Sequence, residues 1–197
     1  NIAYQARENT KWGQEIPENL FFSYVLPYAN LNETVESWRI DFFNKFYPMV
    51  KDMQSAYDAV VFLNQKIFDE LGVIYSTKRP KADQSPYESI NAGMASCTGL
   101  SILLIDVCRS VGIPARFVGT PSWYNNSGNH SWVEIWDGEW HFTGAAEPTE
   151  DRLNESWFED LASKAEKGSD KYGIFAATWE HTDTYFPMDW LPGCLLY

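Results

Sequence analysis

The chain has 197 residues, of which 45% are hydrophobic, and no Pro-, Gly- or Ser-rich linker divides it, so we expect a single domain over residues 1–197. Acidic residues outnumber basic ones by 27 to 15, giving a net charge of −12, and they are scattered along the chain. We therefore expect neither nucleic acids nor anionic membrane surfaces as partners, because binding to either requires a clustered basic patch. No apolar run approaches the roughly 20 residues of a membrane-spanning helix, which predicts a soluble protein.

The chain begins at Asn1 without an initiator Met and ends on the apolar residues 195–197. These ends suggest a piece excised from a longer product. A signal peptide or lipoprotein anchor would have been removed before this numbering begins, and we expect an extracytoplasmic location, in the periplasm or at the cell surface.

Helical spacing of apolar residues predicts two helices in the first half, over residues 33–47 and 52–71, with Gly72 as the stop of the second. Residues 76–95 contain Gly, Pro and Ser and predict a long loop that leads to Cys97. A further helix, apolar on nearly all sides, is expected from Leu100 until Gly112 and Pro114 end it.

Beyond Pro114 the pattern changes to short strands, expected over residues 115–120, 130–136 and 139–145. Asp137-Gly138 between the last two predicts a hairpin with a two-residue loop. This loop predicts the opposed pairs Trp136 and Glu139, Glu134 and His141, Trp132 and Thr143, and His130 and Ala145. The diagonal neighbours of His130 are then Thr143 and Glu147, within reach of a long side chain.

Cys97 and His130 are the candidate catalytic pair. A thiol at the first turn of a helix meets unpaired backbone N–H groups and the positive end of the helix dipole, which favour the thiolate. An imidazole beside it lowers the pKa of the thiol further, and a third group that accepts from the far ring nitrogen would orient the ring. Glu147 is our candidate for this third group, since Thr143 is shorter and uncharged. The backbone N–H at Ser96–Cys97 is the candidate oxyanion donor.

The spacing of the cysteines and histidines predicts no metal site, and no cofactor is expected. Cys97, Cys108, His130 and His141 match no zinc-binding spacing. Three cysteines, at 97, 108 and 194, cannot all pair within one molecule, and Cys108 is expected to be a buried thiol inside its helix. We expect His141 to be solvated or at the edge of the core, and Arg116 to bind a carboxylate or backbone carbonyls.

Three stretches together resemble the core of the transglutaminase-like superfamily. They are Cys97-Thr98-Gly99-Leu100, then the run from Cys108 to Arg116 with its Arg-x-x-Gly-Ile-Pro-Ala-Arg turn, and finally Asn129-His130-Ser131-Trp132-Val133-Glu134 with Trp140 on the next strand. The resemblance implies an α+β fold with a papain-like core, in which N-terminal helices pack on a small antiparallel sheet. It also implies that Cys97 is the nucleophile, that His130 is the general base and acid, and that an acidic residue orients His130.

This sequence departs from the family at the acidic residue. The family usually carries Asp-Pro a few residues after the strand Trp, whereas here Glu147-Pro148 follows Trp140 at a longer interval. Either Glu147 replaces the Asp, with extra residues inserted, or the triad is incomplete.

The resemblance implies a bacterial, secreted enzyme that acts on amides of a peptide, protein or glycopeptide through a thioester. Hydrolysis is preferred to transfer to an amine, because the bacterial members look largely like peptidases and amidases. The alternatives are a binding or scaffold module of the same fold that recognises peptide or glycan, and an amidase directed at glycopeptides. The sequence makes no prediction of the oligomeric state.

Overall fold

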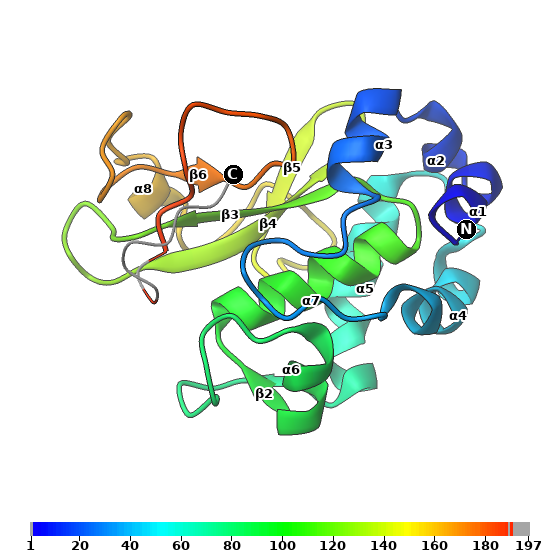
Figure 1. Cartoon of the computed structure of the whole chain (residues 1–197), viewed down its shortest axis with the longest axis horizontal. Coiled ribbons are helices and arrows are strands. Elements are labelled where there is room, and N and C mark those ends of the chain that lie inside the picture. The colour runs from blue at the N-terminus through cyan, green and yellow to red at the C-terminus, as the bar shows by residue number, and fades with distance from the viewer. Residues whose placement is uncertain (1, 189, 191–197) are drawn as a thin grey trace.

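The computed structural model describes residues 2–188 and residue 190, and its helices and small antiparallel sheet form an α+β fold, as predicted. Figure 1 shows helix α7 running beneath strands β3 and β4, with helices α1 to α4 gathered at one end of the molecule. Within the described residues, no helix is long and apolar enough to cross a membrane.

Helix α7 (Cys97–Ser110) is the centre of the structure, and it confirms the helix predicted in this part of the chain. Every residue from Thr98 to Ser110 is buried, because the sheet covers one side of the helix and α4, α5 and α6 cover the others. The apolar character on all its faces follows from this position.

The N-terminal part holds five helices, which are α1 (Ile2–Asn9), α2 (Lys11–Glu15), α3 (Glu18–Tyr24), α4 (Arg39–Val50) and α5 (Ala56–Leu71). Helix α5 ends before Gly72, which adopts the left-handed conformation expected of a helix stop. The prediction of a helix from residue 33 was wrong by six residues. The Glu33 carboxylate instead accepts hydrogen bonds from the backbone N–H groups of Asn30 and Leu31, which holds a turn in place of a first helical turn.

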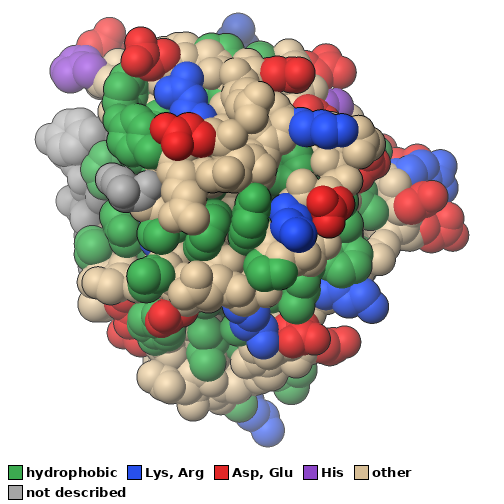
Figure 2. Space-filling model, turned by 90° about the vertical axis from the view of Figure 1, so that its right-hand side faces the viewer, with side chains coloured by type: hydrophobic (Ala, Val, Ile, Leu, Met, Phe, Trp, Pro, Cys, Tyr) green, Lys and Arg blue, Asp and Glu red, His purple; other side chains and the backbone are tan. Residues whose placement is uncertain are grey.

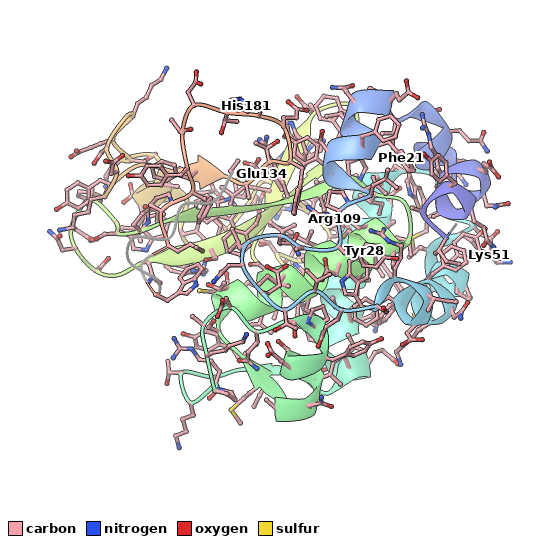
Figure 3. The ribbon with its side chains drawn as sticks, in the orientation of Figure 1. Phe21, Tyr28, Lys51, Arg109, Glu134 and His181 are labelled. Carbon is pink, nitrogen blue, oxygen red and sulfur yellow. The ribbon has the colours of Figure 1, made fainter. Side chains whose placement is uncertain are left out.

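Two buried arginines tie the N-terminal segment to α7. Arg109 donates to the carbonyl oxygens of Ala29 and Ala115, and Arg39 donates to those of Leu26 and Arg109. Figure 3 shows Arg109 between the helical end of the molecule and the sheet. Because buried guanidinium groups need several acceptors, these bonds fix the path of residues 25–30 across α7.

The prediction of an irregular loop over residues 76–95 was wrong in its second half. This segment contains helix α6 (Pro86–Ala92) and strand β2 (Met94–Ala95), which pairs in parallel with β1 (Ile74–Tyr75). Ser85 and Glu88 form a capping box at the start of α6, with Pro86 in its first turn. The segment lies close to α7, because a Cβ on Gly99 would lie only 2.9 Å from Cβ of Ala95.

The sheet has the order β5, β4, β3, β6 and is antiparallel throughout. Its strands are β3 (Ala115–Thr120), β4 (His130–Trp136), β5 (Trp140–Thr143) and β6 (Phe175–Ala176), and the bounds of β3 and β4 are those predicted. A short helix, α8 (Glu159–Ala162), lies between β5 and β6.

The predicted hairpin register was wrong by one residue. Trp136 pairs with Trp140, and Val133 pairs with Thr143, so the loop has three residues, 137–139. The Asp137 carboxylate accepts from the backbone N–H of Tyr57 at the start of α5, which draws the loop toward that helix. The rings of Trp136 and Trp140 then meet edge to face at 5.5 Å, a cross-strand pair that stabilises this register.

The face of the molecule at the helical end carries Lys and Arg side chains interspersed with Asp and Glu, as Figure 2 shows. No broad patch of one sign is visible on this face. Such a surface does not form the clustered basic area that a polyanion would bind.

Candidate active site

The first turn of α7 and the start of β4 bring Cys97 and His130 together. Cys97 is the first residue of α7, and His130 is the first residue of β4. The hydroxyl groups of their neighbours Thr98 and Ser131 lie 3.2 Å apart and form a hydrogen bond. This contact fastens the helix to the strand beside the two candidate catalytic side chains.

The surroundings of Cys97 favour its thiolate. Burial by itself raises the pKa of the thiol, but hydrogen bonding and electrostatic attraction from the His130 side chain lower it, as do hydrogen bonds from Ser131. The net effect is a pKa below the ordinary value of a cysteine. Cys97 therefore has the electrostatic environment of a reactive thiol.

His130 has the complementary shift. Burial lowers its pKa, but interactions with the Cys97 sulfur and the Glu147 carboxylate outweigh burial and raise the pKa to about 9. The Nε2 atom of His130 lies 3.7 Å from Oε2 of Glu147, which is within ion-pair range and beyond hydrogen-bond range. Among the described residues, Nε2 has no hydrogen-bond partner. The histidine is thus held as an imidazolium between a sulfur and a carboxylate.

Glu147 reaches His130 by a route different from the one predicted. Strand β5 ends at Thr143, so no diagonal pair with His130 forms, and the chain turns back between Gly144 and Glu147. The backbone N–H of Glu147 donates to Gly144 O, and a side chain on Gly144 would collide with the Glu147 carboxylate. The predicted residue is therefore near His130, but the reasoning from the hairpin register was wrong.

Asn64 on α5 anchors this turn from inside the core. Its Nδ2 donates to Thr143 Oγ1 at 3.0 Å and to Gly144 O at 2.8 Å, and its Oδ1 accepts from the backbone N–H of Ala146 at 2.9 Å. Thr143, the uncharged alternative to Glu147, is thus engaged with Asn64.

Trp157 covers the pair of His130 and Glu147. Its indole N–H donates to Glu147 Oε2 at 2.9 Å, and its ring lies 4.9 Å from the His130 ring, although 61% of the residue is exposed. Beneath the imidazole lie three buried aromatic side chains, those of Trp123, Trp132 and Phe158. These aromatic side chains limit the access of water to the His130 imidazole, which strengthens the electrostatic interactions of the imidazole.

A cleft of about 200 Å³ opens beside Cys97. Its described lining residues are Arg79, Ala82, Ser96, Cys97, Thr98, Asn129 and Trp190. The Nε1 atom of Trp190 is buried and has no hydrogen-bond partner among the described residues. A larger cavity of about 450 Å³ is lined by Asn30, Leu31 and residues between 175 and 186, and neither Cys97 nor His130 lines it.

The other residues singled out from the sequence lie outside the pair of Cys97 and His130. Arg116 forms an ion pair with Glu134 at 2.6 Å and lies over the Trp140 ring, as a carboxylate-binding arginine was expected to do. His141 is half-buried at the edge of the core, with Nδ1 bonded to Asn154. Cys108 is fully buried, which raises its pKa. Cys194 lies outside the described residues, and within them no cluster of His, Cys, Asp and Glu could hold a metal ion.

Residues 47–145, which are half of the chain, match the sequence model of the transglutaminase-like superfamily. The chain belongs to this superfamily. The matched region of this transglutaminase-like chain includes Cys97 and His130 and ends two residues before Glu147. The search of curated proteins found no significant match.

One solved structure has the same fold at low sequence identity, and two others are similar at a lower score. A Cytophaga hutchinsonii protein described as a candidate cysteine protease is 18% identical and superposes with a TM-score of 0.55, covering 71% of this chain and 46% of that one. The chain thus spans less than half of that protein's length. Legionella pneumophila LapG, 14% identical, gives a TM-score of 0.43 in its calcium-bound form and 0.42 after EGTA treatment. The calcium-bound comparison covers 81% of this chain and 77% of LapG, and the EGTA-treated one covers 79% and 73%.

Three residues of the transglutaminase-like site were missed from sequence. Asn64 comes from a helix 33 positions before Cys97, Trp157 follows β5 in an irregular segment, and Trp190 lies near the end of the chain. No local pattern links any of them to Cys97 or His130, because each contact forms only when the chain folds.

Proposed function

We propose that this transglutaminase-like chain is a cysteine-dependent hydrolase of peptide or protein amides. The observation that carries the proposal is the pair of opposite pKa shifts, with the pKa of Cys97 lowered and that of His130 raised to about 9. Such a pair of shifts favours a thiolate and an imidazolium, which are the nucleophile and general acid that amide cleavage needs.

In the proposed reaction the Cys97 thiolate attacks the amide carbonyl carbon and forms a carbon–sulfur bond. The carbonyl oxygen becomes an oxyanion, for which the backbone N–H of Cys97 at the helix start is a donor. The His130 imidazolium gives its proton to the leaving nitrogen as the carbon–nitrogen bond breaks, and the acyl group remains as a thioester. Neutral His130 then takes a proton from water as the water oxygen attacks the thioester carbon. The carbon–sulfur bond breaks, the carboxylic acid is released, and the Cys97 thiolate and His130 imidazolium are restored.

Glu147 has the role of the orienting acid in this proposal. Its oxygen lies 3.7 Å from Nε2 of His130, so it stabilises the imidazolium by charge at that distance. Hydrolysis is proposed in preference to transfer to an amine. The likeness in fold to a protein described as a candidate cysteine protease is consistent with this choice.

To test the proposed hydrolysis, a denatured protein mixture is incubated with the unaltered chain or with Cys97→Ala. Mass spectrometry then identifies the new peptide termini. New termini that are absent with Cys97→Ala support cysteine-dependent hydrolysis. Addition of a primary amine distinguishes the two acceptors, because a transferase would join the amine to the acyl product. Termini that persist with Cys97→Ala, or an acyl product that always carries the amine, would contradict the proposed hydrolysis.

A binding module of the same fold is the second proposal, for peptide or glycan. It is favoured by the exposed ring of Trp157 at the site and by His130 Nε2, which has no hydrogen-bond partner in the part of the chain that the structure describes. If the chain is a binding module, the unaltered chain and Cys97→Ala should bind the peptide or glycan with equal affinity, and neither should turn it over.

A further inference from the structure

The segment of residues 78–82, which contributes Arg79 and Ala82 to the cleft beside Cys97, is rich in basic residues. Lys78, Arg79 and Lys81 fall within four consecutive positions, although the whole chain has only 15 basic residues against 27 acidic ones. Arg79 and Ala82 from this segment line the cleft beside Cys97. A substrate that approaches the thiol therefore meets the positive charge of Arg79 on a protein that is acidic overall.

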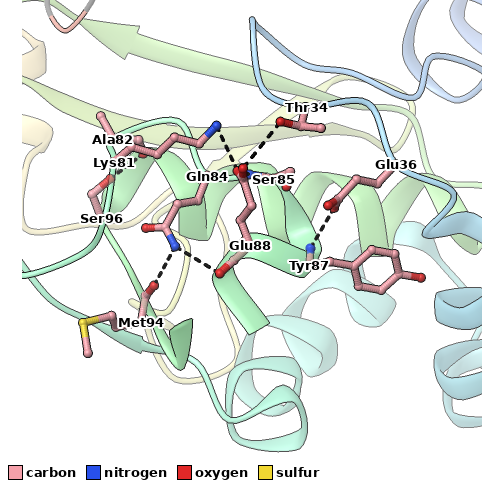
Figure 4. A network of polar contacts seen from close by, with 10 residues as sticks. All are labelled: Thr34, Glu36, Lys81, Ala82, Gln84, Ser85, Tyr87, Glu88, Met94 and Ser96. Atoms are coloured by element: carbon pink, nitrogen blue, oxygen red, sulfur yellow. Dashed lines mark hydrogen bonds and ion pairs between the residues drawn. The ribbon is translucent and has the colours of Figure 1, made fainter. Parts of the chain in front are cut away.

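This segment is held by hydrogen bonds and an ion pair, as Figure 4 shows. Ser96, the residue before Cys97, donates from its hydroxyl to Ala82 O at 2.9 Å. Gln84 donates to the carbonyl oxygens of Glu88 and Met94, and Lys81 forms an ion pair with Glu88 at 2.9 Å. The backbone that follows Arg79 is thus tied both to α6 and to the first turn of α7.

Arg79 has unused binding capacity. Its guanidinium donates to Thr77 O at 2.9 Å, but its buried Nε has no hydrogen-bond partner among the described residues. No carboxylate of the described residues forms an ion pair with Arg79 or with the exposed Lys78, whereas Lys81 is neutralised by Glu88. Apart from the thiolate, Arg79 is the one charged group among the described lining residues of the cleft.

We propose that Arg79 determines substrate specificity by binding a carboxylate of the substrate next to the scissile amide. A guanidinium presents a planar set of donors that matches the two oxygens of a carboxylate. The substrates are then peptides or proteins with an acidic group beside the cleaved bond. This inference rests on the proposed amide hydrolysis, but the charge preference of the cleft can be measured without turnover.

The first measurement compares two alkylating reagents of similar size at Cys97. Iodoacetate carries a carboxylate and iodoacetamide does not, and with both reagents the sulfur–carbon bond forms as iodide leaves. We expect Arg79→Gln to lower the rate with iodoacetate about fivefold relative to iodoacetamide, as loss of one nearby charge predicts. Mass spectrometry of the peptide that contains Cys97 separates its labelling from that of Cys194.

Two matched variants accompany this measurement. Arg79→Lys keeps the charge, and its rate ratio should stay within about twofold of the unaltered chain. Lys51→Gln removes a charge from the end of α4, on the side of the molecule where α7 ends (Figure 3), and should leave the ratio unchanged. Circular dichroism verifies that each variant is folded. An unchanged ratio in folded Arg79→Gln overturns the proposal.

The second measurement asks which carboxylate is bound. A peptide library with internal Asp and Glu is digested with free and with amidated C-termini, by the unaltered chain and by Arg79→Gln. Enrichment of acidic side chains near the cleaved bond that is lost in Arg79→Gln identifies a side-chain carboxylate, whereas loss of cleavage on amidation identifies the C-terminal one. Cleavage without any acidic preference overturns the proposal. Absence of all cleavage contradicts the proposed hydrolysis, and the alkylation ratio then decides the role of Arg79 alone.

Discussion

The indole N–H of Trp157 donates to Oε2 of Glu147 at 2.9 Å, and this same oxygen is the one that lies 3.7 Å from Nε2 of His130. Trp157 therefore restrains the carboxylate oxygen that faces the imidazole. Since Glu147 is partly exposed, with 35% of its side chain accessible, it would otherwise be free to turn toward water.

Trp157→Phe should keep the ring packed on His130 and remove only the N–H donor. We expect the pKa of His130 to fall from about 9 toward its ordinary value and turnover to fall about tenfold, since one hydrogen bond to a charged group is lost. NMR titration of His130 and the pH profile of turnover measure both effects. Trp179→Phe is the matched control, because its exposed indole donates to Ala29 O, and it should alter neither.

Glu147→Gln keeps the size of the side chain and removes its charge. Because the carboxylate is one of the groups that raise the pKa of His130, we expect the variant to titrate at lower pH. In comparable triads, loss of the orienting carboxylate lowers turnover by up to about 10⁴. If NMR finds the His130 titration unmoved in Glu147→Gln, then Glu147 is not the third member.

Gly144→Ala tests how the turn presents Glu147. The added methyl group would occupy the space of the Glu147 carboxylate, so we expect the carboxylate to move away from His130 and the pKa of His130 to fall. The same substitution made in a Glu147→Ala background should have no further effect on that pKa. An equal shift in both backgrounds would mean that Gly144 acts on His130 by another route.

The reactivity of the two described thiols should differ strongly with pH. Cys97 has a lowered pKa and should react with iodoacetamide at a lower pH than an ordinary thiol, whereas Cys108 is fully buried with a raised pKa and should stay unlabelled in the folded protein. The thiolate and imidazolium coexist above the pKa of Cys97 and below that of His130, so turnover should decline as pH rises through about 9. A labelling midpoint for Cys97 at or above 8.5 would contradict the reactive-thiol interpretation.

Asn64→Ala should destabilise the fold, because it removes three hydrogen bonds and leaves the backbone N–H of Ala146 without its acceptor. We expect the free energy of unfolding to fall by about 2–3 kcal/mol, measured by urea denaturation. Lys66→Ala, an exposed position on the same helix, should change it by less than about 0.5 kcal/mol.

The sequence by itself determined the elements that carry the candidate catalytic pair, Cys97 and His130. Apolar residues on all sides predicted the buried helix that begins at Cys97, and the change of period after Pro114 predicted β3 and β4 with their observed bounds. Cys97 and His130 could be named together because the motifs around them resemble those of the superfamily. These signals are local, so the chain expresses them before any long-range contact forms.

Only the tertiary structure decided the hairpin register and the surroundings of the pair. The register follows from the bond between Asp137 and the start of α5, and Glu147 reaches His130 because Asn64 holds the turn before it. Trp157 and Arg79, which also lie at the site, belong to segments whose sequence has no regular periodicity. Each of these contacts joins residues that are distant in sequence, and its free energy is realised only when the core around α7 is packed, so no local pattern could predict it.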